Sequence, residues 1–87
     1  MKVKEFLSLW ADNPSIKIMQ MPIKKIDKGS SPVHRQTALV SELLESNQNY
    51  LGFEIAYFLM DNDLLIVVCE ANKEQERKTI NAYLYGK

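Results

Sequence analysis

Residues 51–70, with the sequence LGFEIAYFLMDNDLLIVVCE, decide the fold of this chain. Two runs rich in aromatic and β-branched residues, 53–60 and 64–69, flank the break Asp61-Asn62-Asp63. Asn and Asp tolerate the left-handed backbone that a tight reversal requires, so the stretch predicts a β-hairpin. The hairpin is a structural signature and not a functional one.

Both faces of the predicted hairpin are apolar. With Asp61-Asn62 as a two-residue loop, the cross-strand pairs are Leu59–Leu64, Tyr57–Ile66 and Ile55–Val68 on one face, and Phe58–Leu65, Ala56–Val67 and Glu54–Cys69 on the other. A solvated face would alternate apolar and polar residues, and neither face does so. A loop one residue longer changes the pairs but leaves both faces apolar. Both faces therefore need cover, either from the chain's own helices or from a partner.

The chain length of 87 residues predicts one domain, 1–87, with a single modest core. A hydrophobic content of 46% and a charged content of 25% are typical of a globular protein. No apolar run approaches the roughly 20 residues that span a bilayer. Glu5 and Ser8 interrupt the apolar N-terminal stretch, which argues against a signal peptide. We expect a cytoplasmic protein that does not enter a membrane.

The few residues suited to catalysis are poorly placed for it. Cys69 is the one cysteine, which excludes an internal disulfide and a thiolate zinc cage within one chain. It lies in an apolar strand where the neutral thiol is favoured, and His34 is expected at a helix start or strand edge. Asp61 and Asp63 belong to a solvated turn, which suits neither acid catalysis nor strong cation binding. We expect no enzymatic activity, no metal and no cofactor.

Two further elements precede the middle of the chain. Val3, Phe6, Leu7 and Trp10 recur at helical spacing and predict a helix that ends before Asp12-Asn13-Pro14. The alternating segment 16–21 predicts a strand ended by Pro22. Residues 23–31, with Gly29 and two serines, predict a flexible loop. That loop lacks the glycine spacing of a phosphate-binding motif.

Residues 33–47 allow two interpretations. Ser31-Pro32 resembles a helix entry, and Val33, Thr37, Val40 and Leu44 follow helical spacing, which favours one long helix. The alternative is an edge strand over 33–39 followed by a short helix over 40–46. The two interpretations differ by one strand in the sheet.

The C-terminal segment predicts a last helix. Asn72 is placed as its N-cap, with Gln75 as the capping-box partner and Glu74–Lys78 as an ion pair one turn apart. Its buried stripe is expected to be Ile80, Tyr83 and Leu84, with Gly86 as the terminator. The whole pattern predicts a small α+β fold, α-β-α-β-β-α, with helices at both termini and a sheet of three strands, or four if 33–39 is a strand.

Charge is distributed unevenly although the formal net charge is zero. The basic residues of segment 17–35 are Lys17, Lys24, Lys25, Lys28 and Arg35. Such a segment is a candidate nucleic-acid contact, because lysines that neutralise phosphates release counterions. No aromatic residue lies among them to stack on a base, and lysines at a sheet edge have a simpler role in blocking strand pairing. Nucleic-acid binding is therefore the alternative hypothesis.

Protein binding is the leading hypothesis. A hairpin with two apolar faces and an end helix bearing Tyr83 and Tyr85 suit a module that binds a partner or itself. If all helices pack on the face of Tyr57, Ile66 and Val68, then Phe58, Met60 and Leu65 remain exposed and form a partner-binding patch. Symmetric pairing of such patches predicts a homodimer.

Three segments resemble small α+β proteins of phages and bacterial mobile elements: VKEFLSLW, IKIMQM, and YLGFEIAYF with DNDLLIVVCE. The resemblance implies a role in binding a host macromolecule. Some such proteins inhibit host nucleases by presenting acidic surface at a nucleic-acid site. For this chain the resemblance would assign that role to a set of carboxylates: Glu42, Glu45, Glu54, Asp61, Asp63 and Glu70.

Overall fold

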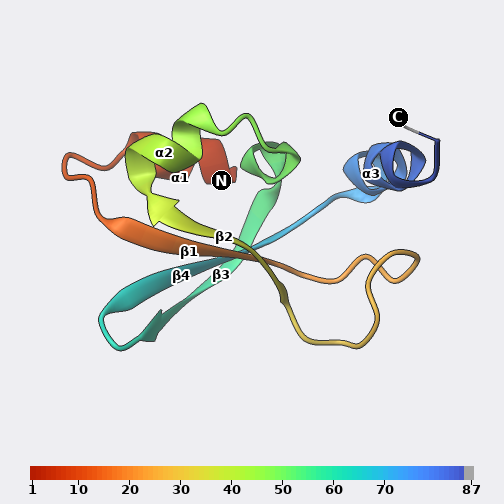
Figure 1. The fold of residues 1–87 in the computed structure, drawn as a ribbon, viewed down its shortest axis with the longest axis horizontal. Coiled ribbons are helices and arrows are strands. Elements are labelled where there is room, and N and C mark those ends of the chain that lie inside the picture. Colours follow the sequence, from red (N-terminus) through yellow and green to blue (C-terminus); the bar gives the residue numbers. More distant parts are fainter. Residues whose placement is uncertain (86–87) are drawn as a thin grey trace.

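The computed structural model describes residues 1–85 and has an α+β fold, the class that the sequence predicts. Its elements are α1 (Val3–Ser8), β1 (Ser15–Gln20), β2 (Val33–Leu39), α2 (Val40–Glu45), the 3-10 helix η1 (Asn49–Gly52), β3 (Glu54–Asp61), β4 (Leu64–Glu70) and α3 (Lys73–Tyr85) (Figure 1). The sheet has four strands, so the order along the chain is α-β-β-α-β-β-α.

The strand order in the sheet is β2-β1-β4-β3. The central strands β1 and β4 run parallel, and each pairs antiparallel with the outer strand beside it. Parallel neighbours require a long connection, and here the chain passes through β2, α2, η1 and β3 between them. Central position explains why β4 is apolar on both faces: Val67 and Val68 are both fully buried.

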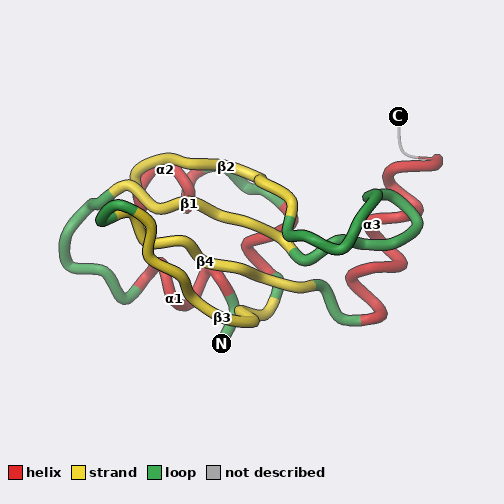
Figure 2. Tube along the Cα trace, turned by 90° about the horizontal axis from the view of Figure 1, so that it is seen from below, coloured by secondary structure: helices red, strands yellow, loops and turns green. Residues whose placement is uncertain are grey.

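The core lies on one face of the sheet. Figure 1 shows α1, α2 and η1 on the same side of the strands, with α3 beyond one end. In Figure 2, seen from below, the strands run in front of α1 and α2. The buried residues that meet between helices and sheet are Val3, Leu7, Ile16, Ile18, Val40, Leu43, Tyr50, Leu51, Phe53, Val67 and Cys69. The helices therefore cover a single face.

The predicted hairpin is present, but its register differs from the expected one. The turn residues are Asn62 and Asp63, at φ 49° and 67°, and Asp61 pairs with Leu64. Both turn residues need the left-handed backbone of a type I′ turn, which Asn and Asp adopt most readily after Gly. The expected Leu59–Leu64 pair is thus wrong by two residues, and Leu59 faces Ile66. An irregularity at Ala56 shifts the register again near the start of β3.

The favoured long helix over 33–47 is wrong, and the alternative of a strand followed by a short helix is correct. Residues of β2 pair with β1, including Ala38 with Ile16 and Gln36 with Ile18. This pairing satisfies backbone groups along the outer side of β1 that a helix would leave open. The chain turns into α2 at Val40, whose N–H bonds to the Pro14 carbonyl at 3.0 Å.

The two terminal helices agree with the prediction only in part. Helix α1 ends at Ser8, so Trp10 lies outside it, 38% exposed, with its ring edge-on to Phe6. Helix α3 has the predicted cap: Asn72 Oδ1 accepts from Gln75 N at 2.8 Å, and Gln75 Oε1 accepts from Asn72 N at 3.0 Å.

The expected buried stripe of α3 is wrong. Tyr83 and Leu84 are 66% and 59% exposed, and no residue of α3 is buried. The helix lies beyond the end of the sheet, where it has little surface to cover (Figure 1). The proposed terminator, Gly86, lies outside the described residues.

Candidate protein-binding surface

The face of the sheet opposite the helices carries two exposed apolar side chains, Tyr57 and Leu59. Side chains alternate along each strand, so the neighbours of core residues point to this face. We call it the open face; its residues are Lys17, Met19, His34, Thr37, Tyr57, Leu59, Asp61, Leu64, Ile66 and Val68. Tyr57 and Leu59 are 41% and 48% exposed, whereas Ile66 and Val68 are buried beside them in the ladder. The β3–β4 half of the face is apolar except for Asp61 beside the turn, and the β1–β2 half adds further polar side chains.

Strand β3 forms one edge of the sheet, and the N-terminus covers only its first part. The Val3 N–H bonds to the Phe53 carbonyl at 3.0 Å, and the Ile55 N–H bonds to the Met1 carbonyl at 2.9 Å. The N-terminal ammonium also pairs with a Glu54 carboxylate oxygen at 3.0 Å. From Tyr57 to Asp61 the outer side of β3 has no neighbouring strand among residues 1–85. The structure therefore leaves a five-residue free edge, 57–61.

The predicted partner-binding residues Phe58, Met60 and Leu65 share one face, but it is the face that carries the helices. Leu65 packs against the core, so it is not part of an exposed patch. Phe58 and Met60 lie at the rim of the helix layer, 48% and 65% exposed, and the Phe58 ring contacts Phe6 at 4.9 Å between centroids. The expectation that the helices pack on the face of Tyr57, Ile66 and Val68 is therefore wrong. They pack on the opposite face, which carries Phe58, Met60 and Leu65.

The exposed apolar pair on the open face that the sequence pattern does not single out is Tyr57 and Leu59. Their alternation with Phe58 and Met60 was visible in the sequence, and it placed them correctly on one face of the hairpin. The hairpin pattern does not indicate which of its two faces the helices cover. That choice depends on α1, α2 and η1, which lie elsewhere in the chain.

The basic residues of segment 17–35 do not form one surface. Lys17 lies on the open face of the central strand β1, while Lys24, Lys25 and Lys28 are exposed in the connection from β1 to β2. Arg35 is an exposed residue of β2 with side-chain partners in the protein: its Nε donates to Gln20 Oε1 at 2.8 Å, and its Nη2 lies 3.6 Å from Asp27 Oδ2. Four lysines separated over a strand and a loop give a weak field for phosphate binding.

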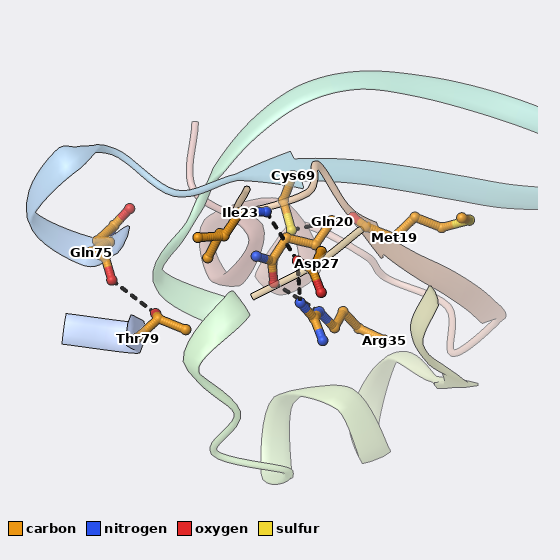
Figure 3. A network of polar contacts seen from close by, with 8 residues as sticks. All are labelled: Met19, Gln20, Ile23, Asp27, Arg35, Cys69, Gln75 and Thr79. Atoms are coloured by element: carbon orange, nitrogen blue, oxygen red, sulfur yellow. Dashed lines mark hydrogen bonds and ion pairs between the residues drawn. The ribbon is translucent and has the colours of Figure 1, made fainter. Parts of the chain in front are cut away.

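The contacts of Arg35 belong to a small polar network at the end of the sheet (Figure 3). Asp27 also accepts from the Ile23 N–H at 3.0 Å, a bond within the loop, while its ion pair with Arg35 ties the loop to β2. The Gln20 amide is buried, and its Nε2 finds no hydrogen-bond partner among the described residues. A cavity of about 210 Å³ lies next to this network, between η1 and α3. The network orders the loop, and no local pattern of residues indicates it.

The residues considered for catalysis lie in different surroundings, with Cys69 in the core and His34 exposed. Cys69 is fully buried, and its Sγ donates to the Met19 carbonyl at 3.3 Å. Burial raises the pKa of the Cys69 thiol from 9.0 to about 11, so the thiol is neutral and shielded from reagents. His34 is on the edge strand β2, where it contacts Thr37 Oγ1 at 2.9 Å. Within residues 1–85, no three His, Cys, Asp or Glu side chains gather as metal ligands do.

No protein-family model, curated protein or solved structure matches this chain. Among the helices that the structure describes, none has both the length and the apolar character needed to cross a membrane. The geometry of the sheet is therefore the basis for assigning a function.

Proposed function

We propose that this chain is a non-catalytic protein-binding module of the cytoplasm that binds its partner through the open face of the sheet. The observation that carries the proposal is the exposed β3 part of that face, where Tyr57 and Leu59 are each more than 40% exposed beside the buried Ile66 and Val68. Exposed apolar side chains that adjoin one another on a rigid sheet are typical of a protein interface.

The chemistry of the surface favours a protein over a nucleic acid. Phosphate recognition needs clustered cations, whereas the open face contributes one lysine, Lys17, next to apolar side chains. Tyr57 supplies a large amphipathic ring of the kind that is enriched at protein interfaces. The resemblance to phage and mobile-element proteins stays a prediction, and it points to a macromolecule of a bacterial host as the partner.

The test is affinity capture from a lysate of the native host with three baits: wild type, Tyr57→Lys and Leu9→Lys. Leu9 is 70% exposed and follows α1, so its substitution adds the same charge away from the open face. We expect wild type and Leu9→Lys to retain the same protein, and Tyr57→Lys to lose it while keeping a wild-type circular dichroism spectrum. Recovery of nucleic acid alone, released by salt, would refute the proposal and favour the basic segment. Capture that is indifferent to Tyr57→Lys would remove the open face from the proposal.

A further inference from the structure

The free edge of β3 has a backbone and a side-chain pattern that match a second copy of itself. An exposed strand edge presents unpaired N–H and C=O groups, which natural proteins usually guard with charges, proline or bulges. Both edge strands have an irregular register, β2 against β1 and β3 at Ala56, but β2 also carries His34 and Arg35 along its length. Between Tyr57 and Met60 the edge of β3 has no charge and no proline. We propose that two copies of the chain pair antiparallel along residues 57–61 and join their sheets into one.

The hairpin turn determines which backbone groups face outward. Pairs along an antiparallel ladder alternate between those that exchange hydrogen bonds and those that do not, and the pair closing a two-residue turn exchanges them. That pair is Asp61–Leu64, so Leu59 and Tyr57 also bond to β4. It follows that Phe58 and Met60 direct their N–H and C=O groups to the free edge.

These outward residues also determine the register of the dimer. Phe58 and Met60 are symmetric about Leu59, so a two-fold axis at Leu59 places Phe58 of one copy opposite Met60 of the other, twice. An axis at Phe58 would run the second copy into Met1, which already bonds to Ile55. An axis at Met60 would bring Phe58 against the turn residue Asn62. The axis at Leu59 is thus the register that uses the whole free edge.

The side chains agree with this register. On the helix side, each half-exposed Phe58 ring lies opposite an exposed Met60, and sulfur–aromatic contacts of this kind are favourable. On the open face, Leu59 meets its own copy, and Asp61 lies opposite Tyr57 rather than opposite another carboxylate. The two open faces become continuous across the joined sheets. The inference rests on the proposed function and adds a second copy as the occupant of this edge.

The exposed area limits how much surface the dimer can bury. The four side chains from Tyr57 to Met60 are 41% to 65% exposed. With roughly 200 Å² for a side chain of this size, they offer about 400 Å² per copy, or about 800 Å² for the pair. Stable interfaces bury about 1,200–2,000 Å², so an edge of this smaller area supports a weak, reversible dimer.

Cysteine cross-linking tests the register directly. In this dimer Leu59 and its copy form a non-hydrogen-bonded pair with Cα atoms about 4.5 Å apart, within the disulfide range of about 4.4–6.8 Å. Leu59→Cys should form a disulfide dimer under mild oxidation at least about tenfold faster than Tyr57→Cys, because residues 57 lie more than about 13 Å apart. Cys69 is fully buried and does not compete. Equal cross-linking rates for the two variants would overturn the proposed register.

A proline substitution tests the backbone pairing. Met60→Pro removes an outward N–H and is tolerated at an edge, so it should keep the wild-type circular dichroism spectrum and weaken dimerisation at least about tenfold in sedimentation equilibrium. Met60→Val retains the N–H and should dimerise as wild type does. A Met60→Pro variant that unfolds would show that the N–H points inward, and a wild type that is monomeric at about 500 µM would refute the dimer. Either result leaves the capture experiment with Tyr57→Lys valid on its own.

Discussion

Leu43→Ala and Leu59→Ala remove the same atoms from opposite sides of the sheet, so they test which face the helices cover. Leu43 is fully buried between α2 and the sheet, whereas Leu59 is 48% exposed on the open face. Each substitution deletes the equivalent of three carbon groups, and burial of each contributes about 0.8 kcal/mol. The transfer loss is then about 2.4 kcal/mol at Leu43 and about half of that at Leu59.

A cavity increases the difference. Leu43→Ala leaves a void in a close-packed core, which brings its total cost to about 3–4 kcal/mol. Leu59→Ala leaves only a more open surface, so we expect a cost of about 1 kcal/mol. For a domain of this size the difference of about 2–3 kcal/mol corresponds to a Tm difference of roughly 8–24 °C.

Urea unfolding followed by circular dichroism measures both costs, at about 1 µM protein so that dimerisation does not contribute. The slope of the free energy of unfolding against urea concentration should be the same for wild type and both variants. Equal costs at the two sites would mean that the open face is covered in the monomer, and would remove the basis of the proposed function. A cost at Leu59 that grows with protein concentration is the expected signature of the dimer.

Two further predictions concern residues of the hairpin, Cys69 in β4 and Asp63 in the turn. Because the pKa of Cys69 is raised from 9.0 to about 11, the neutral thiol is favoured in the folded state. The free energy of unfolding should therefore be insensitive to this group below about pH 9 and fall by up to about 2–3 kcal/mol between pH 9 and 11. Cys69→Ala should lack that fall, keeping only the part above pH 10 that comes from Tyr50, whose pKa burial also raises. Separately, Asp63→Val places a β-branched residue at φ 67° and should cost about 1–2 kcal/mol in urea unfolding, whereas Asp63→Gly should not destabilise; an equal effect of the two would contradict the type I′ turn.

The dimer and the open face belong to the same functional hypothesis but depend on different groups. The open face acts through side chains such as Tyr57, and the free edge acts through the main chain of Phe58 and Met60. A partner that needs the joined face would bind Met60→Pro less well than Met60→Val. A partner that binds one copy would not distinguish these variants.

Local sequence decided the elements whose stability comes from neighbouring residues. The hairpin follows from two β-rich runs around an Asx turn, and the α3 cap follows from Asn72 and Gln75, because both depend on contacts within a few residues. The burial of Cys69 follows from its place in an apolar strand. Alternation along β3 also separated Tyr57 and Leu59 from Phe58 and Met60.

Tertiary structure decided everything that depends on distant segments. Residues 33–39 became a strand because β1 offered an unpaired side, although their spacing also fits a helix. The helices pack on the face of Val67 and Cys69, so Tyr57 and Leu59 on the other face remain exposed. The sequence does not indicate this choice, because both faces of the hairpin are apolar. Among residues 1–85 the edge is free because β3 is outermost in the order β2-β1-β4-β3 and the backbone bonds of Met1 and Val3 to it stop at Ile55. Strand order is a balance of long-range pairings, and no local pattern of residues encodes it.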